Sequence, residues 1–179
     1  LTLVPGVRFE ATQTTYGAPQ YRLGSSSSIQ NRTYFLGTND YLNVLPGIHM
    51  RYLLWKDTPL RVSFSRSLAR PNYGDLAPFV LQDTTALTIS RGNPNLKVTT
   101  SNNFDAAVEH YFWNVGVVSG GFFYKGLNDY IYTVTSQDTV GTDLYRITQP
   151  VNGQDAHPYG VETSFVRDLD FLPKPFTGF

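Results

Sequence analysis

Aromatic and charged residues occur together in three polar stretches of the sequence, around residues 16–39, 72–91 and 135–155. Aromatic rings stack on the apolar faces of small molecules, and charged groups hydrogen-bond to hydroxyls and carboxylates. The pattern therefore predicts non-covalent ligand binding, although the same rings could simply pack the stretches together. The candidate ligand-binding residues are Tyr21, Arg22, Arg32, Tyr34, Tyr73, Phe79, Arg91, Asp138, Asp143 and Tyr145.

No arrangement of residues predicts catalysis. The three histidines, His49, His110 and His157, lie far apart and lack the paired spacing of a helical metal site. The chain contains no cysteine, no Gly-x-Ser-x-Gly elbow and no phosphate-binding glycine loop. We therefore expect that the protein is not an enzyme and has neither a cofactor nor a metal site.

Six runs of the sequence alternate apolar and polar residues, which is typical of strands with one apolar face. No run shows the 3.6-residue repeat of a helix, and Thr, Val, Tyr and Phe are frequent within them. The sequence therefore predicts an all-β fold, an antiparallel meander of about six long strands. The runs lie near residues 3–12, 48–54, 60–65, 104–112, 118–125 and 159–165.

The connections between these runs are alternately short and long. Tight hairpins are expected at Lys56–Pro59 and at Asn114–Val115, and long loops near residues 17–39, 72–100 and 135–155. Short turns at one end and long loops at the other are typical of a transmembrane barrel in an outer membrane.

The two faces of the predicted strands differ in chemistry. A barrel would turn its charged face to a polar lumen and its apolar face to lipid, although a soluble sheet with one wet face gives the same alternation. We expect one face to carry Arg51, Arg61, Asp105, Glu109 and Glu162. The opposite face should carry Met50, Val62, Val108 and Val161.

Composition agrees with a barrel and gives no sign of a nucleic-acid-binding protein. Phe, Tyr and Trp make up 15% of the chain, and such residues form the interfacial girdles of membrane barrels. Both tryptophans, Trp55 and Trp113, lie beside expected short turns. The chain has 14 basic and 14 acidic side chains among its 179 residues, so its charge gives no reason to expect nucleic acid as a partner.

Two segments resemble signatures of TonB-dependent receptors. The first, LARPNYGDLAP at residues 68–78, contains the Arg70-Pro71 pair that in the family leads from a strand into an extracellular loop. The second, GNPNLK at residues 92–97, is similar to the stretch that follows in the family, with Gly92, Asn93, Pro94, Leu96 and Lys97 matching it. The chain departs from the family at Val98, where proline is common. The expected role of both segments is structural, because proline and asparagine shape turns, although a ligand contact by Arg70 is the alternative.

The resemblance implies the architecture of a bacterial outer-membrane transporter. Such receptors are similar to 22-stranded barrels whose lumen holds a plug domain. Residues 1–179 would be a fragment of that barrel domain, with the plug domain and the signal peptide absent. The implied partners are outer-membrane lipid, the TonB complex acting through the plug, and a small-molecule or oligosaccharide ligand. The pattern looks most like receptors of the Caulobacter and Xanthomonas type, so a glycan is the favoured ligand and an iron chelate the alternative.

Two other functions are compatible with an all-β chain rich in aromatic residues. A secreted carbohydrate-binding β-sandwich would use the rings as a stacking platform and would be soluble without detergent. A passive porin would share the barrel fold, but the two signature segments argue against it.

Overall fold

Extended strands make up most of the structure, a computed structural model that describes residues 1–23, 29–112 and 116–168. The described strands form one ten-stranded sheet, accompanied by the single-turn helix α1 (Tyr73–Leu76). The prediction of an all-β fold is therefore confirmed. The strands are β1 (Thr2–Leu23), β2 (Ile29–Trp55), β3 (Thr58–Ala69), β4 (Val80–Asp83), β5 (Thr88–Arg91), β6 (Thr99–Phe112), β7 (Gly116–Asn128), β8 (Ile131–Val140), β9 (Asp143–Asn152) and β10 (Tyr159–Arg167).

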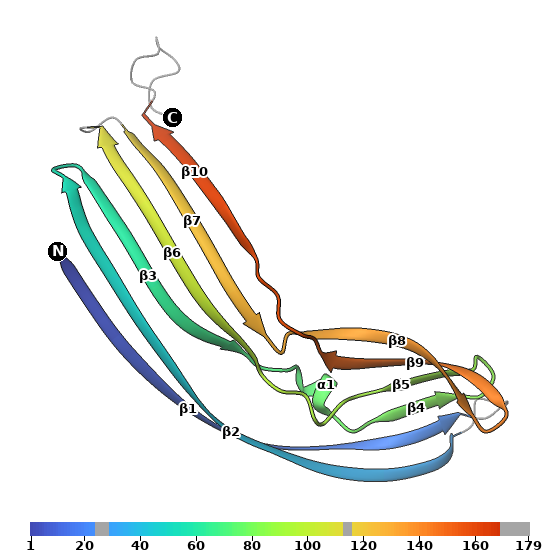
Figure 1. Ribbon diagram of the computed structural model, residues 1–179. Coiled ribbons are helices and arrows are strands. Elements are labelled where there is room, and N and C mark those ends of the chain that lie inside the picture. The colour runs from blue at the N-terminus through green and yellow to red at the C-terminus, as the bar shows by residue number, and fades with distance from the viewer. Residues whose placement is uncertain (24–28, 113–115, 169–179) are drawn as a thin grey trace.

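Six long strands form a meander in the order β1-β2-β3-β6-β7-β10, and every neighbouring pair in it is antiparallel. They run side by side in Figure 1 and contain the six runs predicted from the sequence. Of the remaining four strands, β4, β5 and β9 lie within connections that the sequence predicted to be long, and β8 begins four residues before one of them. The number of long strands and their pairing are thus as predicted.

The tight turns of the meander lie at one end. Residues 56–57 form the turn between β2 and β3, as predicted, and the Tyr111 N–H donates to the Asp57 carbonyl across 3.0 Å. The predicted hairpin at Asn114–Val115 lies outside the described residues, but Phe112 pairs with Gly116 at the ends of β6 and β7. Trp55, 71% exposed, ends β2 at this same edge.

Strand register confirms the predicted facing. Residues paired directly across antiparallel strands share a face. One such row contains Arg51, Arg61, Ala107, Gly121 and Glu162, on what we call the polar face. The neighbouring row contains Met50, Val62, Ala106, Phe122 and Val161, on the apolar face. Large apolar side chains are exposed along that second face, among them Leu3, Phe9, Ile48, Phe64, Val108, Phe122 and Val161.

The prediction of a long loop at residues 17–39 is wrong for most of these residues. β1 and β2 continue through it as one ladder, from Thr2 paired with Arg51 to Leu23 paired with Ile29. The run lacks a regular apolar alternation, but a ladder needs only backbone pairing, which does not depend on such a pattern.

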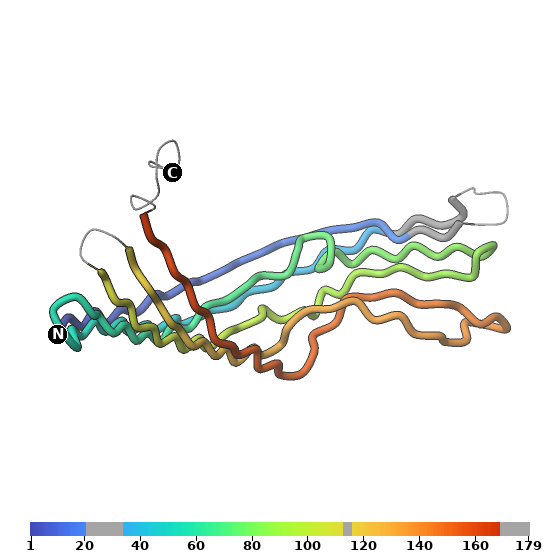
Figure 2. Tube along the Cα trace, turned by 90° about the horizontal axis from the view of Figure 1, so that it is seen from above, coloured from blue at the N-terminus to red at the C-terminus, as the bar shows by residue number. Residues whose placement is uncertain are grey.

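The other long connections also fold into strands. Hairpin β4–β5 follows α1, and hairpin β8–β9 follows β7. Two parallel pairings, β1 with β4 and β5 with β9, join them to the far end of the β1–β2 hairpin. We call this assembly, in the order β2-β1-β4-β5-β9-β8, the loop sheet; its hairpins extend together in Figure 2. The predicted antiparallel meander therefore holds for the long strands and not for these two contacts.

Buried apolar side chains are few and lie within or beside the loop sheet. One cluster joins Tyr16 to Leu76 and Leu96, and a second joins Ile89 to Tyr145 and Ile147. The described strands lie in one sheet rather than two packed sheets, so the β-sandwich alternative is not favoured. Among the described residues, no helix has the length and apolar character needed to cross a membrane.

Candidate ligand-binding surface

The segment Gly92–Lys97, which connects β5 to β6, is fixed by hydrogen bonds to the chain before β4 and to β9. The Gly92 N–H donates to the Phe79 carbonyl (3.1 Å), and a Cβ at Gly92 would lie 2.0 Å from the Ala77 carbonyl oxygen. Only glycine fits so close to that backbone. Asn93 donates from Nδ2 to the Pro150 carbonyl (3.0 Å), while its Oδ1 accepts from the Asn95 N–H (3.0 Å).

Tyr16 anchors the same segment to β1. Its hydroxyl donates to the Pro94 carbonyl across 2.9 Å, and its ring packs with Leu96, which is 1% exposed. Burial raises the pKa of the Tyr16 phenol, which favours the protonated hydroxyl that donates this bond. Tyr16 was not predicted from the sequence as a functional residue, because 78 residues separate it from Pro94.

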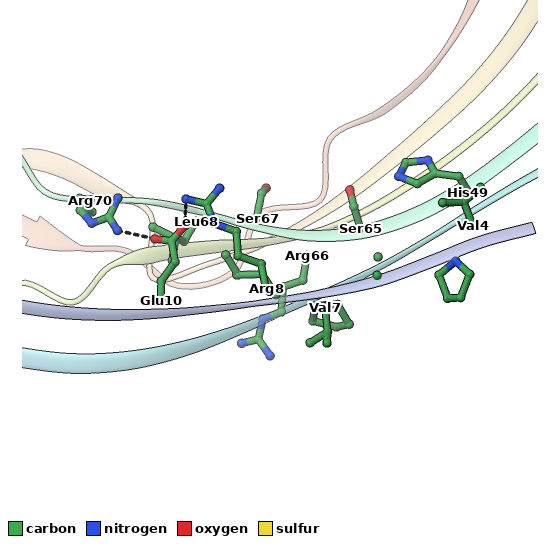
Figure 3. Close-up of a pocket in the computed structure, with 15 residues that line it drawn as sticks. Val4, Val7, Arg8, Glu10, His49, Ser65, Arg66, Ser67, Leu68 and Arg70 are labelled. Atoms are coloured by element: carbon green, nitrogen blue, oxygen red, sulfur yellow. Dashed lines mark hydrogen bonds and ion pairs between the residues drawn. The ribbon is translucent and has the colours of Figure 1, made fainter.

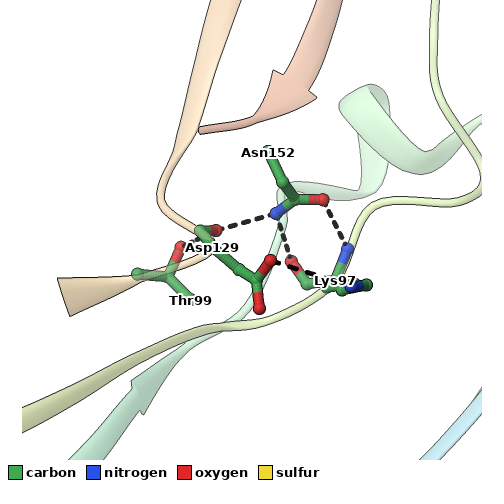
Figure 4. A network of polar contacts seen from close by, with 4 residues as sticks. All are labelled: Lys97, Thr99, Asp129 and Asn152. Atoms are coloured by element: carbon green, nitrogen blue, oxygen red, sulfur yellow. Dashed lines mark hydrogen bonds and ion pairs between the residues drawn. The ribbon is translucent and has the colours of Figure 1, made fainter. Parts of the chain in front are cut away.

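Asn152 closes the base of the loop sheet with its side-chain amide. Oδ1 accepts from the Lys97 N–H (2.9 Å), and Nδ2 donates to the carbonyls of Lys97 (3.0 Å) and Asp129 (2.7 Å), as Figure 4 shows. Thr99 also donates to the Asp129 carbonyl (3.1 Å), and Lys97 Nζ lies 3.8 Å from Asp129 Oδ1. One amide therefore holds the ends of β7 and β9 against the segment Gly92–Lys97. The sequence carries no local signal for this role, since 55 residues separate Asn152 from Lys97.

The Arg70-Pro71 pair follows β3 directly. Arg70 forms an ion pair with Glu10 of β1 and hydrogen-bonds to Thr12 Oγ1 (3.4 Å). Glu10 also pairs with Arg8, and its side chain is only 11% exposed. The contact fastens the chain leaving β3 to the polar face of β1, and it gives Arg70 a structural partner.

The predicted ligand-binding residues divide between several environments. The side chains of Tyr21, Arg22 and Arg32 lie outside the described residues. Tyr73 of α1 is 77% exposed, whereas Phe79 is half-buried. Tyr145 is 3% exposed and packs in the cluster with Ile89 and Ile147, so its ring is not presented at the surface.

Register places the remaining candidates on faces of the loop sheet. On β1, Tyr16 and Gln20 share the face of Glu10, because strand side chains alternate. Gln20 pairs with Val80, and Val80 pairs with Arg91, so Arg91 lies on the continuation of the polar face.

The same face extends across β9 and β8. Ile89 pairs with Ile147, and Tyr145 pairs with Asp138, which places Asp138 and Asp143 on this side, both exposed. Arg91 donates from Nε to Gln149 Oε1 (2.9 Å). Tyr34, 62% exposed, pairs with Pro19 and lies on the opposite side, which continues the apolar face.

A hollow of about 620 Å³ lies where β2 and β3 separate. Their ladder ends at Gly47 paired with Ser65, and Pro46, which has no N–H to donate, lies directly beyond. Arg8, Glu10, His49, Ser65, Ser67 and Arg70 line its polar side, shown in Figure 3. In the described part of the chain, no cluster of three or more His, Cys, Asp or Glu side chains could hold a metal ion.

A sequence comparison decides the family. The family model described as TonB dependent receptor-like, beta-barrel, matches residues 1–177. The chain belongs to the TonB-dependent receptor β-barrel family. Members of this family are receptors and transporters, which confirms the prediction that the chain is not an enzyme. No curated protein shows significant sequence similarity to the chain.

Solved structures of TonB-dependent receptors share the fold at low identity. The Serratia marcescens hemophore receptor HasR, solved with its hemophore HasA and heme, superposes with a TM-score of 0.65 and 14% identity. That match covers 91% of this chain and 28% of HasR. A mutant of the Pseudomonas aeruginosa ferric enterobactin receptor PfeA, in complex with enterobactin, superposes with a TM-score of 0.58 at 20% identity. That match covers 74% of this chain and 21% of PfeA.

The siderophore receptor PirA from Acinetobacter baumannii gives a TM-score of 0.56 at 18% identity, over 77% of this chain and 23% of PirA. These homologous receptors are outer-membrane β-barrels. The chain thus spans between 21% and 28% of the length of these receptors.

Proposed function

We propose that the chain forms part of the barrel wall and extracellular loops of a bacterial outer-membrane receptor. The receptor binds an extracellular ligand and imports it with energy that the TonB complex supplies through a plug domain. In this proposal the meander belongs to a 22-stranded barrel, its apolar face contacts outer-membrane lipid, and its polar face lines the lumen.

The single observation that supports this function best is the continuity of the polar face. Through β1 and β4, the face that carries Glu10 and Arg61 continues into the face of the loop sheet that carries Arg91 and Asp138. A ligand bound among the loops would therefore meet one connected polar surface leading toward the lumen. Loops on a rigid scaffold are also where binding groups usually lie.

A glycan is the favoured ligand class, as for receptors of the Caulobacter and Xanthomonas type. The exposed ring of Tyr73 offers a stacking surface, and the carboxylates of Asp138 and Asp143 accept hydrogen bonds from sugar hydroxyls.

An iron chelate or heme is the second candidate. HasR was solved with heme, PfeA with enterobactin, and PirA is a siderophore receptor. The identities of 14–20% carry only the fold from these receptors to this chain.

Uptake by cells carrying the full-length receptor tests the proposal. Three variants replace the outer parts of the loop sheet, residues 17–38, 80–91 or 132–151, by short turns, and an insertion between Lys56 and Asp57 at the opposite edge is the control. We expect at least one loop variant to lose uptake of a glycan while the control retains it. Wild-type glycan uptake by all three variants would refute the loops as the binding site, and loss of iron-chelate uptake alone would replace the glycan by a chelate.

A further inference from the structure

The hollow between β2 and β3 lies at the end of the meander from which the loop sheet emerges. Its floor is a cross-strand row in which Gly6 pairs with Gly47, and Gly47 pairs with Ser65. A Cβ added at Gly6 would meet nothing within 4 Å. Two facing glycines thus leave open, on the polar face, a space that ordinary side chains would fill.

The groups around this space include more positive than negative charge. Arg8 and Arg70 both pair with Glu10, so two guanidinium groups share one carboxylate and one positive charge remains. The Arg8 side chain is 74% exposed, and a guanidinium has five N–H donors, more than its single ion pair with Glu10 uses. Arg8 can therefore bind a second anionic group while keeping Glu10.

Hydroxyl donors border the same space. Ser65 and Ser67 project from β3 on the side of His49 and Arg70 in Figure 3. The Ser67 Oγ accepts a hydrogen bond from Asn103 Nδ2 (3.0 Å), which leaves its own hydrogen available for donation. A guanidinium and hydroxyl donors around an open floor suit a planar or tetrahedral oxyanion.

We propose that this hollow binds a carboxylate or phosphate group, held by Arg8 with Ser65 and Ser67. The anionic group has two possible sources, an acidic ligand such as a uronic-acid glycan, or an acidic side chain from the rest of the receptor. The inference rests on the proposed receptor function and adds to it a site selective for negative charge.

The test uses the intact receptor purified in detergent, with trigalacturonate as the anionic probe and galactotriose as its neutral counterpart. Arg8→Gln removes the guanidinium, and Gly6→Val fills the floor without changing charge. Arg146→Gln is the control for Arg8→Gln, because Arg146 lies on the side of the loop sheet opposite the polar face. Gly120→Val is the control for Gly6→Val, because Gly120 lies on the apolar face and its Cβ would also meet open space. Calorimetry measures binding of both sugars, and limited proteolysis measures how firmly the plug is held.

A ligand-borne acid is supported when the wild type prefers trigalacturonate and both hollow variants weaken it about tenfold or more, with the controls unchanged. A receptor-borne acid is supported when the hollow variants make the plug more sensitive to protease and the controls do not. The proposal is overturned when the hollow variants match their controls in both measurements. If the hollow variants match their controls but galactotriose still binds, the anion site is refuted and the proposed receptor function is not.

Discussion

The ring of Tyr16 lies over Gly37, its direct partner on β2. A Cβ added at Gly37 would lie 2.3 Å from Tyr16 Cε2, closer than atoms can approach without displacement. The ring is held there by its hydroxyl bond to Pro94 and by packing against Leu76 and Leu96. This cross-strand pair thus positions the ring that joins the segment Gly92–Lys97 to β1.

Gly37→Ala should therefore loosen the base of the loop sheet. The methyl group must push the Tyr16 ring away from Leu96, at a cost of about 1–3 kcal/mol. Hydrogen exchange of the intact receptor should show faster exchange at residues 92–97. Gly6→Ala is the matched control, since its methyl group meets open space. Equal protection of residues 92–97 in both variants would contradict the packing role of Gly37.

Alkaline pH should loosen the same contact. Burial raises the pKa of Tyr16 in the folded state, so folding favours the protonated phenol. This stabilisation is complete below the unfolded value of about 10 and is lost as pH rises through the higher folded value. The fall in protection at residues 92–97 above about pH 10 should be smaller in Tyr16→Phe than in the wild type. Identical pH profiles would show that other groups cause the loss.

Asn152→Asp should weaken the network at the base of the loop sheet more than its small change in shape suggests. The carboxylate keeps the bond from the Lys97 N–H but faces the carbonyls of Lys97 and Asp129 without a proton to donate. The Asp129 carbonyl then keeps only its bond from Thr99, and each lost hydrogen bond costs about 0.5–1.5 kcal/mol. Exchange at residues 97–99 and 129–131 should accelerate in Asn152→Asp. Gln137→Glu, on exposed β8, is the charge-matched control and should leave those residues unchanged.

Arginine should be tolerated at residue 107 and not at residue 108. Val108 lies on the apolar face, where Arg or Lys costs about 2–4 kcal/mol at the middle of a bilayer. Ala107 lies in the row of Arg61 on the polar face, between the carboxylates of Asp105 and Glu109 on the same strand face. Folded receptor in outer-membrane fractions should fall for Val108→Arg and stay near wild type for Ala107→Arg. Equal assembly of the two variants would show that the apolar face does not contact lipid.

The sequence by itself determined the strands of the meander and their facing. Alternation along residues 104–112 and 118–125 is a local property, so it identifies β6 and β7 and puts Val108 and Glu109 on opposite faces before any pairing is known. The short turn at Lys56–Asp57 determines that β2 and β3 are neighbours, because tight hairpins join adjacent antiparallel strands.

Only the tertiary structure decided how the connections fold. The β1–β2 hairpin extends through residues 17–39 because its two arms pair with each other, although neither arm has a regular apolar alternation. The candidate Tyr145 is buried, because β9 pairs in parallel with β5 and brings Ile89 beside Ile147. Tyr16, Asn152 and the hollow over Gly6 and Gly47 likewise depend on contacts between residues far apart in sequence. Such contacts depend on register and strand order, which local spacing along the chain does not encode.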